Sequence, residues 1–519
     1  MTRAARRIIA NTAAGSAARI ATIAIALLTT PVLVNHLGAE AFGLLTVLVA
    51  LPAYAGLLDF GIGAGLVKHL TECSEADDAA GVRHVMTLGL ACYVLLGLAL
   101  TPCVYLLTLA ITQALALAEP IRRTTQVCAT LMVLSFAVSG VAGVFSARLV
   151  SLHRMDVAAL IGLLGQCAYA ALVFAVIPAS PTILTAVWLA LAQAALTGGL
   201  LGLAVARAGR SILCDPRGIP RPLIRRMLAF GGWMQVNALT AVINLEADKL
   251  IIAWFLGLAS VTPYQIGNRL ASLNRVVPFQ MLAAMMPVAT TVQAGGTRAE
   301  AAAFYREMSR YLMLLTLAIT GFTVVVADRL IATWIGQPYP EAATIACTLA
   351  LSLSVNNLTG GGTTMARASG QPRYETYYAV LSMTLNVGLT VVLAPPFGLA
   401  GILAGTVVAN LVGSVYFLAL FHRRFRFPWS ETVGDWLWRL LAAMGFACAA
   451  LALVQTCEPT DLPAGRLAGL ALLTLYGVVY LAVFTAGLTL LGFWSAGDRA
   501  FLRACVGRAG RREGAGGSP

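Results

Sequence analysis

The sequence predicts an all-α, polytopic integral membrane protein with about fourteen transmembrane helices. Of its 519 residues, 59% are hydrophobic and only 11% are charged, whereas soluble domains carry about 25% charged residues. Its apolar segments run for about 20 residues, which is the length of a helix that crosses a bilayer. They lack the short alternation of apolar and polar residues that marks a barrel strand. Composition and segment length together therefore predict a helical membrane protein.

Turn signals and charges delimit each expected helix. In chain order, the expected helices cover residues 8–34, 41–67, 84–113, 124–147, 155–178, 183–206, 227–256, 260–290, 311–331, 339–366, 374–395, 398–421, 437–456 and 467–492. The first helix follows Arg3, Arg6 and Arg7 in the manner of a signal peptide. Its apolar stretch is too long for one and no clean cleavage site follows, so we interpret it as a retained first helix.

The distribution of the 35 basic residues predicts the topology. Most of them fall in one set of alternate loops, whereas the opposite set holds only Arg122, Arg123, Arg329 and Arg466. Basic loops stay in the cytoplasm, so both termini are expected there, as an even number of helices requires. The net charge of +13 therefore indicates membrane topology rather than nucleic-acid binding.

An internal repeat divides the chain. A shift of about 219 residues aligns Leu37-Gly38 with Leu256-Gly257, Leu51 with Leu270, Phe60 with Phe279, Ala64 with Ala283, Gly143 with Gly362, Ala147-Arg148 with Ala366-Arg367, and Arg154 with Arg373. Because this shift spans six helices, the two halves would share one orientation in the membrane. The expected domains are an N-terminal six-helix lobe (1–207), a cytoplasmic linker (208–226), a C-terminal six-helix lobe (227–424), helices 13 and 14 (425–498) and a disordered cytoplasmic tail (499–519).

Four cationic side chains lie deep within apolar segments: Arg19, Lys249, Arg269 and Arg275. A charge at the centre of a membrane helix costs roughly 2.5–3.5 kcal/mol even on the lenient insertion scale. Each of them therefore predicts a polar cavity, an ion-pair partner or an anionic substrate. Arg19 follows Arg7 by about 12 residues, or roughly 18 Å along a helix, which places it near the middle of the bilayer.

Polar residues on two expected helices mark the faces that would line such a cavity. In 227–256, one helical face carries Trp233, Asn237, Thr240, Asn244 and Asp248. In 260–290, a broad polar surface carries Gln265, Asn268, Arg269, Ser272 and Arg275. From these helices and the first one, the candidate substrate-binding residues are Arg19, Arg269, Arg275, Asn237, Asn244 and Asn268.

The charged residues also have structural interpretations. Arg19 could pair with the acidic Asp59 as an interhelical lock instead of binding substrate, and Arg275 could do the same. Lys249 points about 100° away from Asp248 on a helix, and we expect it to pair with Glu246, three residues earlier. Asp59 and Asp248 are expected to organise the charge of the site, or to couple it to a proton or sodium gradient.

Other chemistry is absent from the sequence pattern. The ten cysteines are scattered without a CxxC spacing, and the five histidines lie at expected helix ends, so we expect no metal site. The run Gly360-Gly361-Gly362 lacks the Lys-Ser/Thr pair of a phosphate loop and is interpreted as close helix packing. With no enzyme constellation, we expect neither catalytic residues nor a cofactor.

The N-terminal segment resembles a known family. Residues 11–68, with Pro31-Val-Leu-Val-Asn-His-Leu-Gly38 and Leu57-Leu-Asp-Phe-Gly-Ile-Gly63, look like the polysaccharide-biosynthesis flippases of the multidrug/oligosaccharidyl-lipid/polysaccharide exporter superfamily. Residues 246–257 and Tyr264 are similar to the second half of the same family. The resemblance covers nearly the whole chain. It implies an O-antigen-type flippase that moves undecaprenyl-diphosphate-linked oligosaccharides across the bacterial cytoplasmic (inner) membrane by alternating access, for lipopolysaccharide or exopolysaccharide biosynthesis.

The same resemblance implies roles and partners. Arg19, Arg269 and Arg275 would bind the diphosphate or an acidic sugar, because guanidinium forks suit phosphate oxygens. The implied partners are a lipid-linked glycan, membrane lipids and polysaccharide polymerase machinery. A lipid-linked peptidoglycan-precursor flippase and a cation-coupled multidrug antiporter of the same superfamily remain alternatives. The antiporter would prefer acidic cavity residues, and a membrane polymerase or ligase would carry a large external loop that is missing here.

Overall fold

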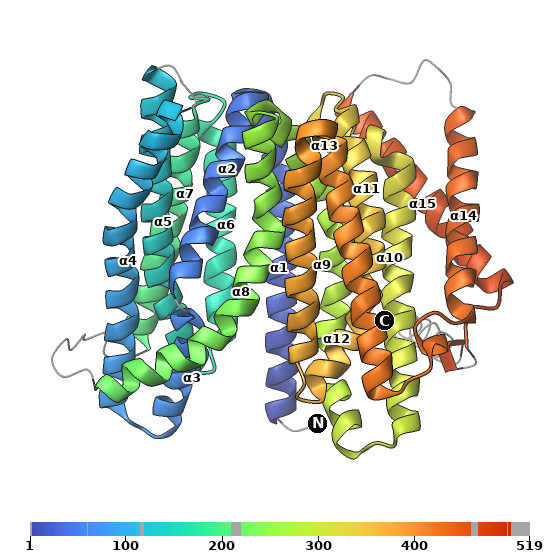
Figure 1. The fold of residues 1–519 in the computed structure, drawn as a ribbon, viewed down its shortest axis with the longest axis horizontal. Coiled ribbons are helices and arrows are strands. Elements are labelled where there is room, and N and C mark those ends of the chain that lie inside the picture. The colour runs from blue at the N-terminus through green and yellow to red at the C-terminus, as the bar shows by residue number, and fades with distance from the viewer. Residues whose placement is uncertain are drawn as a thin grey trace, which may run out of the picture. The chain divides into compact units, whose positions relative to one another are not determined.

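Every regular element in the described part of the chain is a helix (Figure 1). The computed structural model describes residues 3–59, 61–114, 119–208, 220–457, 465–495 and 497–499. Within these ranges, twelve segments are long and apolar enough to cross a membrane. Helix α8 (Arg221–Phe255) covers the expected 227–256 helix but is not one of these twelve segments. The long α13 (Arg373–Phe425) is kinked at Gly398 into two arms, which cover the expected helices 374–395 and 398–421. The predicted fold class is confirmed.

The remaining elements alternate long helices with short turns. The first half of the chain holds α1 (Arg3–Leu37), α2 (Ala39–Gly56), the 3-10 turn η1 (Leu57–Asp59), α3 (Ile62–Glu75), α4 (Ala79–Ala114), α5 (Glu119–Ser151), α6 (Met155–Val176) and α7 (Ile183–Arg207). The second half adds α9 (Leu258–Gly295), α10 (Arg298–Ile335), α11 (Pro340–Asn357), α12 (Thr359–Ala368), the 3-10 turn η2 (Trp429–Glu431), α14 (Asp435–Thr456) and α15 (Arg466–Leu490).

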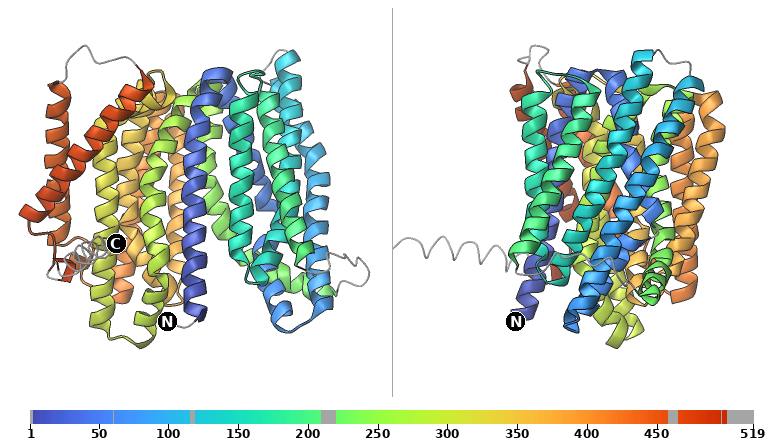
Figure 2. Two further views of the ribbon diagram at one scale, coloured as in Figure 1. Left: turned by 180° about the vertical axis from the view of Figure 1, so that it is seen from behind. Right: turned by 90° about the vertical axis from the view of Figure 1, so that its left-hand side faces the viewer.

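The helices form two compact units. Unit 1 comprises Met1–Ile266 and Ala379–Ala409, and unit 2 comprises Gly267–Tyr378 and Asn410–Pro519. In unit 1, α4, α5, α7 and α6 pack in a row and α1 lies against α6 (Figure 2). In unit 2, α10 packs against α11, α14 and α15. The lobe limits expected from the repeat stay a prediction, and the expected linker and tail fall largely outside the described residues.

Two helices expected to be continuous are interrupted. The predicted 41–67 helix ends at Gly56, and α3 begins at Ile62 after the turn η1. Asp59 accepts a 2.7 Å hydrogen bond from the N–H of Gly61, and Gly61 has φ 73°, a left-handed conformation that suits glycine. The predicted 339–366 helix likewise divides at Leu358 into α11 and α12. Apolar periodicity cannot detect such breaks, because they depend on local backbone hydrogen bonds.

The 219-residue repeat is present in the backbone. The C-terminal ends of α1 and α8 correspond within one residue under this shift, and α2 and α9 begin at corresponding residues. Each pair is joined through one glycine in the left-handed region, Gly38 with φ 82° and Gly257 with φ 88°. The repeat therefore extends from residue identity to helix limits and joint conformation.

The starts of α2 and α9 cross in a self-complementary contact within unit 1. A Cβ atom on Gly43 would overlap the carbonyl oxygen of Leu258, and the hydroxyl of Thr262 donates to the carbonyl of Ala39. Under the repeat shift, Gly43 corresponds to Thr262 and Ala39 to Leu258. The contact therefore maps onto itself, as at an interface of two-fold symmetry.

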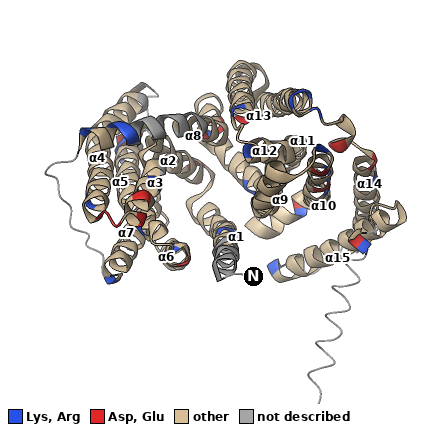
Figure 3. Ribbon diagram, turned by 90° about the horizontal axis from the view of Figure 1, so that it is seen from below, with Lys and Arg blue, Asp and Glu red and all other residues tan. Residues whose placement is uncertain are grey.

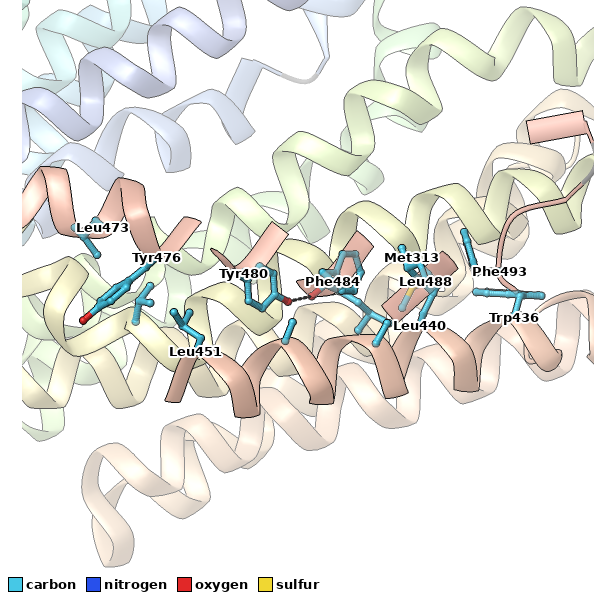
Figure 4. Close-up of a cluster of buried hydrophobic side chains, with 14 residues drawn as sticks. Met313, Trp436, Leu440, Leu451, Leu473, Tyr476, Tyr480, Phe484, Leu488 and Phe493 are labelled. Atoms are coloured by element: carbon cyan, nitrogen blue, oxygen red, sulfur yellow. Dashed lines mark hydrogen bonds between the residues drawn. The ribbon is translucent and has the colours of Figure 1, made fainter. Parts of the chain in front are cut away.

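Helices α14 and α15 pack against α10, and α15 is also hydrogen-bonded to it. Their shared core includes Tyr476, Tyr480 and Phe484 from α15 (Figure 4), and Tyr480 donates to the carbonyl of Leu317 on α10 at 3.5 Å. At one end of α10, Arg329 donates to the hydroxyl of Tyr476. At the other end, Arg310 forms a 2.6 Å ion pair with Asp498.

Candidate functional site

The predicted site residues of unit 1 lie on α1, η1 and α8. Arg19 is exposed on α1, Asn244 is half-buried on α8, and Asp248 is buried four residues further on. Asn237 lies on α8, but its side chain is outside the described residues. Asp59, in η1, is half-buried. Asp59 and Asp248 have separate hydrogen-bond partners, so the structure does not bring these two carboxylates into one direct contact.

The other predicted residues belong to unit 2. Asn268, Arg269 and Arg275 lie on α9 after the point where that helix enters unit 2, and all three side chains are half-buried. Asn268 and Arg275 are seven residues apart and so share one face of the helix, two turns apart. That these residues form one cavity with Arg19 and Asn244 stays a prediction.

Asp248 is the centre of a buried cluster of oxygen atoms in unit 1. It is 4% exposed. Its Oδ2 accepts hydrogen bonds from the hydroxyl of Tyr264 at 2.7 Å and of Thr406 at 3.5 Å. Its Oδ1 accepts from the amide of Asn386 at 3.4 Å, and the hydroxyl of Thr390 donates to the other end of that amide at 3.4 Å. Helices α8 and α9 and both arms of α13 thus meet at one carboxylate, which we call the Asp248 centre.

The donors around the Asp248 centre are neutral hydroxyl and amide groups. The neighbouring Lys249 is engaged elsewhere, because its Nζ lies 2.6 Å from Glu246 Oε2. This pair confirms the partner predicted from the helical spacing. A buried carboxylate is costly unless its charge is compensated, and the hydrogen bonds from Tyr264, Thr406 and Asn386 provide such compensation.

Asp59 has a local structural role. Besides the N–H of Gly61, it accepts hydrogen bonds from the hydroxyl of Tyr93 on α4 at 2.9 Å and from the N–H of Gly63 at 3.4 Å. It therefore holds the start of α3 and ties it to α4. Among the described residues no ion pair joins Asp59 to Arg19, so the interhelical lock considered for these two is not observed.

A buried polar network holds the part of α9 that carries Arg275. The amide of Asn274 donates to Thr320 Oγ1 at 2.7 Å, to the carbonyl of Ala350 at 2.9 Å and to Ser354 Oγ at 3.0 Å. In return, Asn357 donates to the carbonyl of Asn274 at 2.8 Å. These links join α9 to α10 and α11 and fix the rotation of α9 at the residue next to Arg275.

Asn274 and Ser354 are not among the residues predicted from the sequence. A signal was present, because Asn274 adjoins Arg275, and Asn356 and Asn357 stand together in an apolar segment. The triple glycine has the packing role that was predicted. A Cβ atom on any of Gly360, Gly361 and Gly362 would overlap side chains of α10 or α13.

Among the described residues, no group of three His, Cys, Asp or Glu side chains could hold a metal ion. The eight cysteines that the structure describes are free thiols. The described site residues offer hydrogen-bonding groups, guanidinium charge and the buried carboxylate of Asp248.

The fold matches known transporters. An inward-facing multidrug-resistance MATE transporter of the MOP superfamily superposes with a TM-score of 0.66 at 17% identity, over 78% of this chain and 94% of that one. The lipid II flippase MurJ, in an inward closed conformation, superposes with a TM-score of 0.67 at 13% identity, over 92% of this chain and 99% of that one. At such identities the likeness concerns the fold. No curated protein sequence matches the chain.

A sequence-family model adds the family. The model described as polysaccharide biosynthesis protein matches residues 8–293, more than half of the chain, from α1 to the end of α9. This range contains every candidate site residue predicted above. The chain is a multi-pass membrane protein with the fold of MOP-superfamily transporters, and it belongs to the polysaccharide biosynthesis protein family.

Proposed function

We propose that the protein is a flippase for undecaprenyl-diphosphate-linked oligosaccharide repeat units. It moves them from the cytoplasmic to the periplasmic leaflet of the bacterial cytoplasmic membrane by alternating access, without covalent chemistry. The observation that carries the proposal is the family match over residues 8–293, because this range holds Arg19, Arg269 and Arg275. The transporter fold supports the same mechanism.

The intramembrane arginines suit the part of the substrate that crosses the bilayer least readily. A diphosphate is a concentrated anion, and a guanidinium fork offers it charge-assisted, bidentate hydrogen bonds. Arg269 and Arg275 are half-buried, and the network around Asn274 fixes the helix that presents them. The prenyl tail can remain in lipid while the headgroup passes.

The Asp248 centre is the proposed coupling site. Its carboxylate and hydroxyl oxygens are hard donors of the kind that bind alkali and alkaline-earth cations, and its carboxylate can alternatively take a proton. Both arms of α13 contribute side chains to the Asp248 centre. Binding of a cation or a proton to Asp248 would therefore change the relative free energies of different arrangements of α8, α9 and α13. We propose that a sodium or proton gradient drives transport through this carboxylate, whereas Asp59 organises α3 and α4.

The experiment is transport in proteoliposomes. We expect the purified protein to move an undecaprenyl-diphosphate-linked oligosaccharide across the bilayer, as measured by the fraction of glycan that a membrane-impermeant glycosidase can reach. Replacing Arg269 with alanine should lower the rate at least tenfold. Arg123→Ala serves as the control, because that side chain is 79% exposed at the start of α5 and should leave the rate unchanged.

The cellular counterpart uses a deletion strain. Loss of the gene should cause a lipid-linked oligosaccharide to accumulate in the cytoplasmic leaflet, and wild-type protein should clear it. Normal surface polysaccharide in cells that hold Arg269→Ala at the wild-type protein level would refute the assigned role of the arginine.

One alternative has a specific observation in its favour. The fold likeness to a lipid II flippase covers 92% of this chain, so a lipid-linked peptidoglycan precursor is the second candidate substrate. The two are separated by the glycan that accumulates after deletion and by cell lysis, which only a block in peptidoglycan synthesis should cause. A multidrug antiporter, the third candidate, would instead confer resistance to organic cations.

A further inference from the structure

The connection between α13 and α14 lies at the boundary of the membrane. Two candidate spans, Arg373–Phe425 and Trp429–Thr456, are separated by only three residues. The side chains on either side of this gap therefore lie at the level of the lipid headgroups, whichever leaflet that is. Residues 422–439, which belong to unit 2, are called the α13–α14 connection below.

The inner side of the α13–α14 connection is held by a chain of buried hydrogen bonds. His422 Nδ1 donates to the carbonyl of Phe427 at 3.0 Å, because a carbonyl can only accept. The other ring nitrogen, Nε2, lies 2.7 Å from the hydroxyl of Thr432, which is also hydrogen-bonded to Tyr305 of α10. Thr432 is fully buried. The connection is thus anchored to α10 and does not depend on its outer side chains for its shape.

The outer side carries arginines and indoles. Arg423, Arg424 and Arg426 are exposed, and no acidic residue lies among them. In Figure 3, the blue residues at the end of α13 mark this group. Trp429 is 50% exposed and Trp438 is 53% exposed.

The local conformation fixes this arrangement. Arg426 ends α13 in the left-handed conformation with φ 53°, and its carbonyl accepts a hydrogen bond from Arg298. The Arg424 Nε donates to the hydroxyl of Tyr374 at 3.1 Å. The acidic Glu431 is mostly buried and faces Arg306 at 3.9 Å. The exposed charges of the α13–α14 connection are thus three arginines, Arg423, Arg424 and Arg426, and one carboxylate, Asp435 at the start of α14, which leaves a positive balance.

We propose that the α13–α14 connection is a binding surface for anionic phospholipid headgroups. Trp side chains favour the membrane–water interface, and basic residues close to it attract anionic lipids. The arginines can bind the phosphate of a phosphatidylglycerol or cardiolipin headgroup while Trp429 and Trp438 enter the acyl boundary. This proposal is independent of the transported substrate.

The test measures lipid binding by the full-length protein. Purified protein in neutral detergent is titrated with cardiolipin and with phosphatidylcholine, and bound lipids are counted by native mass spectrometry. We expect the triple variant Arg423→Gln, Arg424→Gln, Arg426→Gln to weaken cardiolipin binding at least tenfold, with phosphatidylcholine binding unchanged. The matched control is Arg122→Gln, Arg123→Gln at the start of α5, which should change cardiolipin binding less than twofold.

Two further measurements keep the test decisive. The single variant Arg423→Glu, which leaves the buried hydrogen bonds intact, should also weaken cardiolipin binding if the triple variant fails to fold. Cardiolipin binding that is equal in wild type and both variants would overturn the proposal. The proposal would also be overturned if the variants no longer bound an undecaprenyl-diphosphate-linked glycan but still bound cardiolipin. The arginines would then be part of the substrate path.

Discussion

At the scale of single residues, Asp498 shows how a carboxylate can hold a chain segment in place. It pairs with Arg310 at 2.6 Å and accepts hydrogen bonds from Tyr311 and from the N–H of Ser495. Burial raises the pKa of Asp498, but the hydrogen bonds from Tyr311 and Ser495 and the charge of Arg310 outweigh it and hold the pKa below its usual range. The ionised form therefore stabilises the fold.

We expect Asp498→Asn to lower the free energy of unfolding by about 1–3 kcal/mol at neutral pH, because a hydrogen-bonded charge is lost. The contribution of Asp498 is present above the unfolded pKa of about 3.9 and is lost as the pH falls through the lower folded pKa. Wild type and variant should therefore converge in strong acid. Thermal unfolding in detergent across pH measures this, and the exposed Glu307→Gln is the control. A constant difference at all pH values would contradict the linkage.

Replacement of Asp248 tests whether its carboxylate couples transport to an ion gradient. Asp248→Asn keeps the shape of the side chain and removes its ability to exchange a proton or to neutralise a cation. We expect protein level and thermal stability to change little and the response of transport to sodium and pH gradients to disappear, with a rate at least tenfold lower under a gradient. Proteoliposome flux measures it, and Asp156→Asn, exposed at the start of α6, is the control. An unchanged response to both gradients would remove Asp248 from the coupling mechanism.

The contacts that could be predicted from the sequence are those between residues close together in the chain. Lys249 and Glu246 were paired correctly because they are three residues apart on one helix. The partners of Asp248 could not be assigned, since Asn386 and Thr406 lie 138 and 158 residues away and only tertiary packing brings them there. The sequence pattern places Asp59 inside the expected 41–67 helix. The Gly61–Asp59 hydrogen bond that ends the helix there depends on the left-handed backbone of Gly61, which apolar periodicity does not reveal.

At the scale of helices, the crossing of α2 and α9 depends on Gly43. We expect Gly43→Ala to lower the free energy of unfolding by about 1–3 kcal/mol, because the added methyl overlaps the Leu258 carbonyl and a packed backbone yields little. Gly199→Ala on α7 is the control, since nothing lies within 4 Å of its added Cβ and helix propensity favours alanine. Thermal unfolding of the two variants measures the difference. Equal thermal stability of the Gly43→Ala and Gly199→Ala variants would show that α2 and α9 can move apart at the crossing without a cost in free energy.

Helix limits were predicted best where a glycine or a charge ends the apolar segment. The joints at Gly38, Gly257 and Gly398 all have positive φ, and the expected helices end close to them. The interruptions near Asp59 and Leu358 are not predicted, because the flanking segments are apolar on both sides and the breaks depend on local hydrogen bonds such as those of Gly61 N–H to Asp59 and of Leu358 N–H to the Val355 carbonyl.

At the scale of the whole molecule, the basic loops predict a topology with both termini in the cytoplasm. We expect a membrane-impermeant maleimide to label Ser180→Cys, between α6 and α7, in intact spheroplasts. Gly296→Cys, between α9 and α10, should react only after permeabilisation. Both are made in a background without the native cysteines, and a cytoplasmic protein serves as the leakage control. The reverse labelling pattern would invert the topology and with it the direction of transport.

The fold class could be predicted from the sequence because it rests on composition and on the spacing of long apolar segments, and the family could be predicted from the resemblance carried by motifs such as Pro31–Gly38 and Leu57–Gly63. The arrangement of the candidate site could not be predicted, since its residues belong to helices that are distant in the chain. The compact units are Met1–Ile266 with Ala379–Ala409 and Gly267–Tyr378 with Asn410–Pro519, and the lobe limits expected from the repeat stay a prediction.

The crossing of α2 and α9 has a consequence for the sequence of the chain. A contact that maps onto itself under the repeat shift is the contact that two identical half-length chains would make across the axis of a homodimer. The Gly43–Leu258 and Thr262–Ala39 pairs occupy equivalent positions of that contact. A single chain can hold different residues at the two positions, here a glycine and a threonine, whereas a homodimer would have to repeat one residue at both.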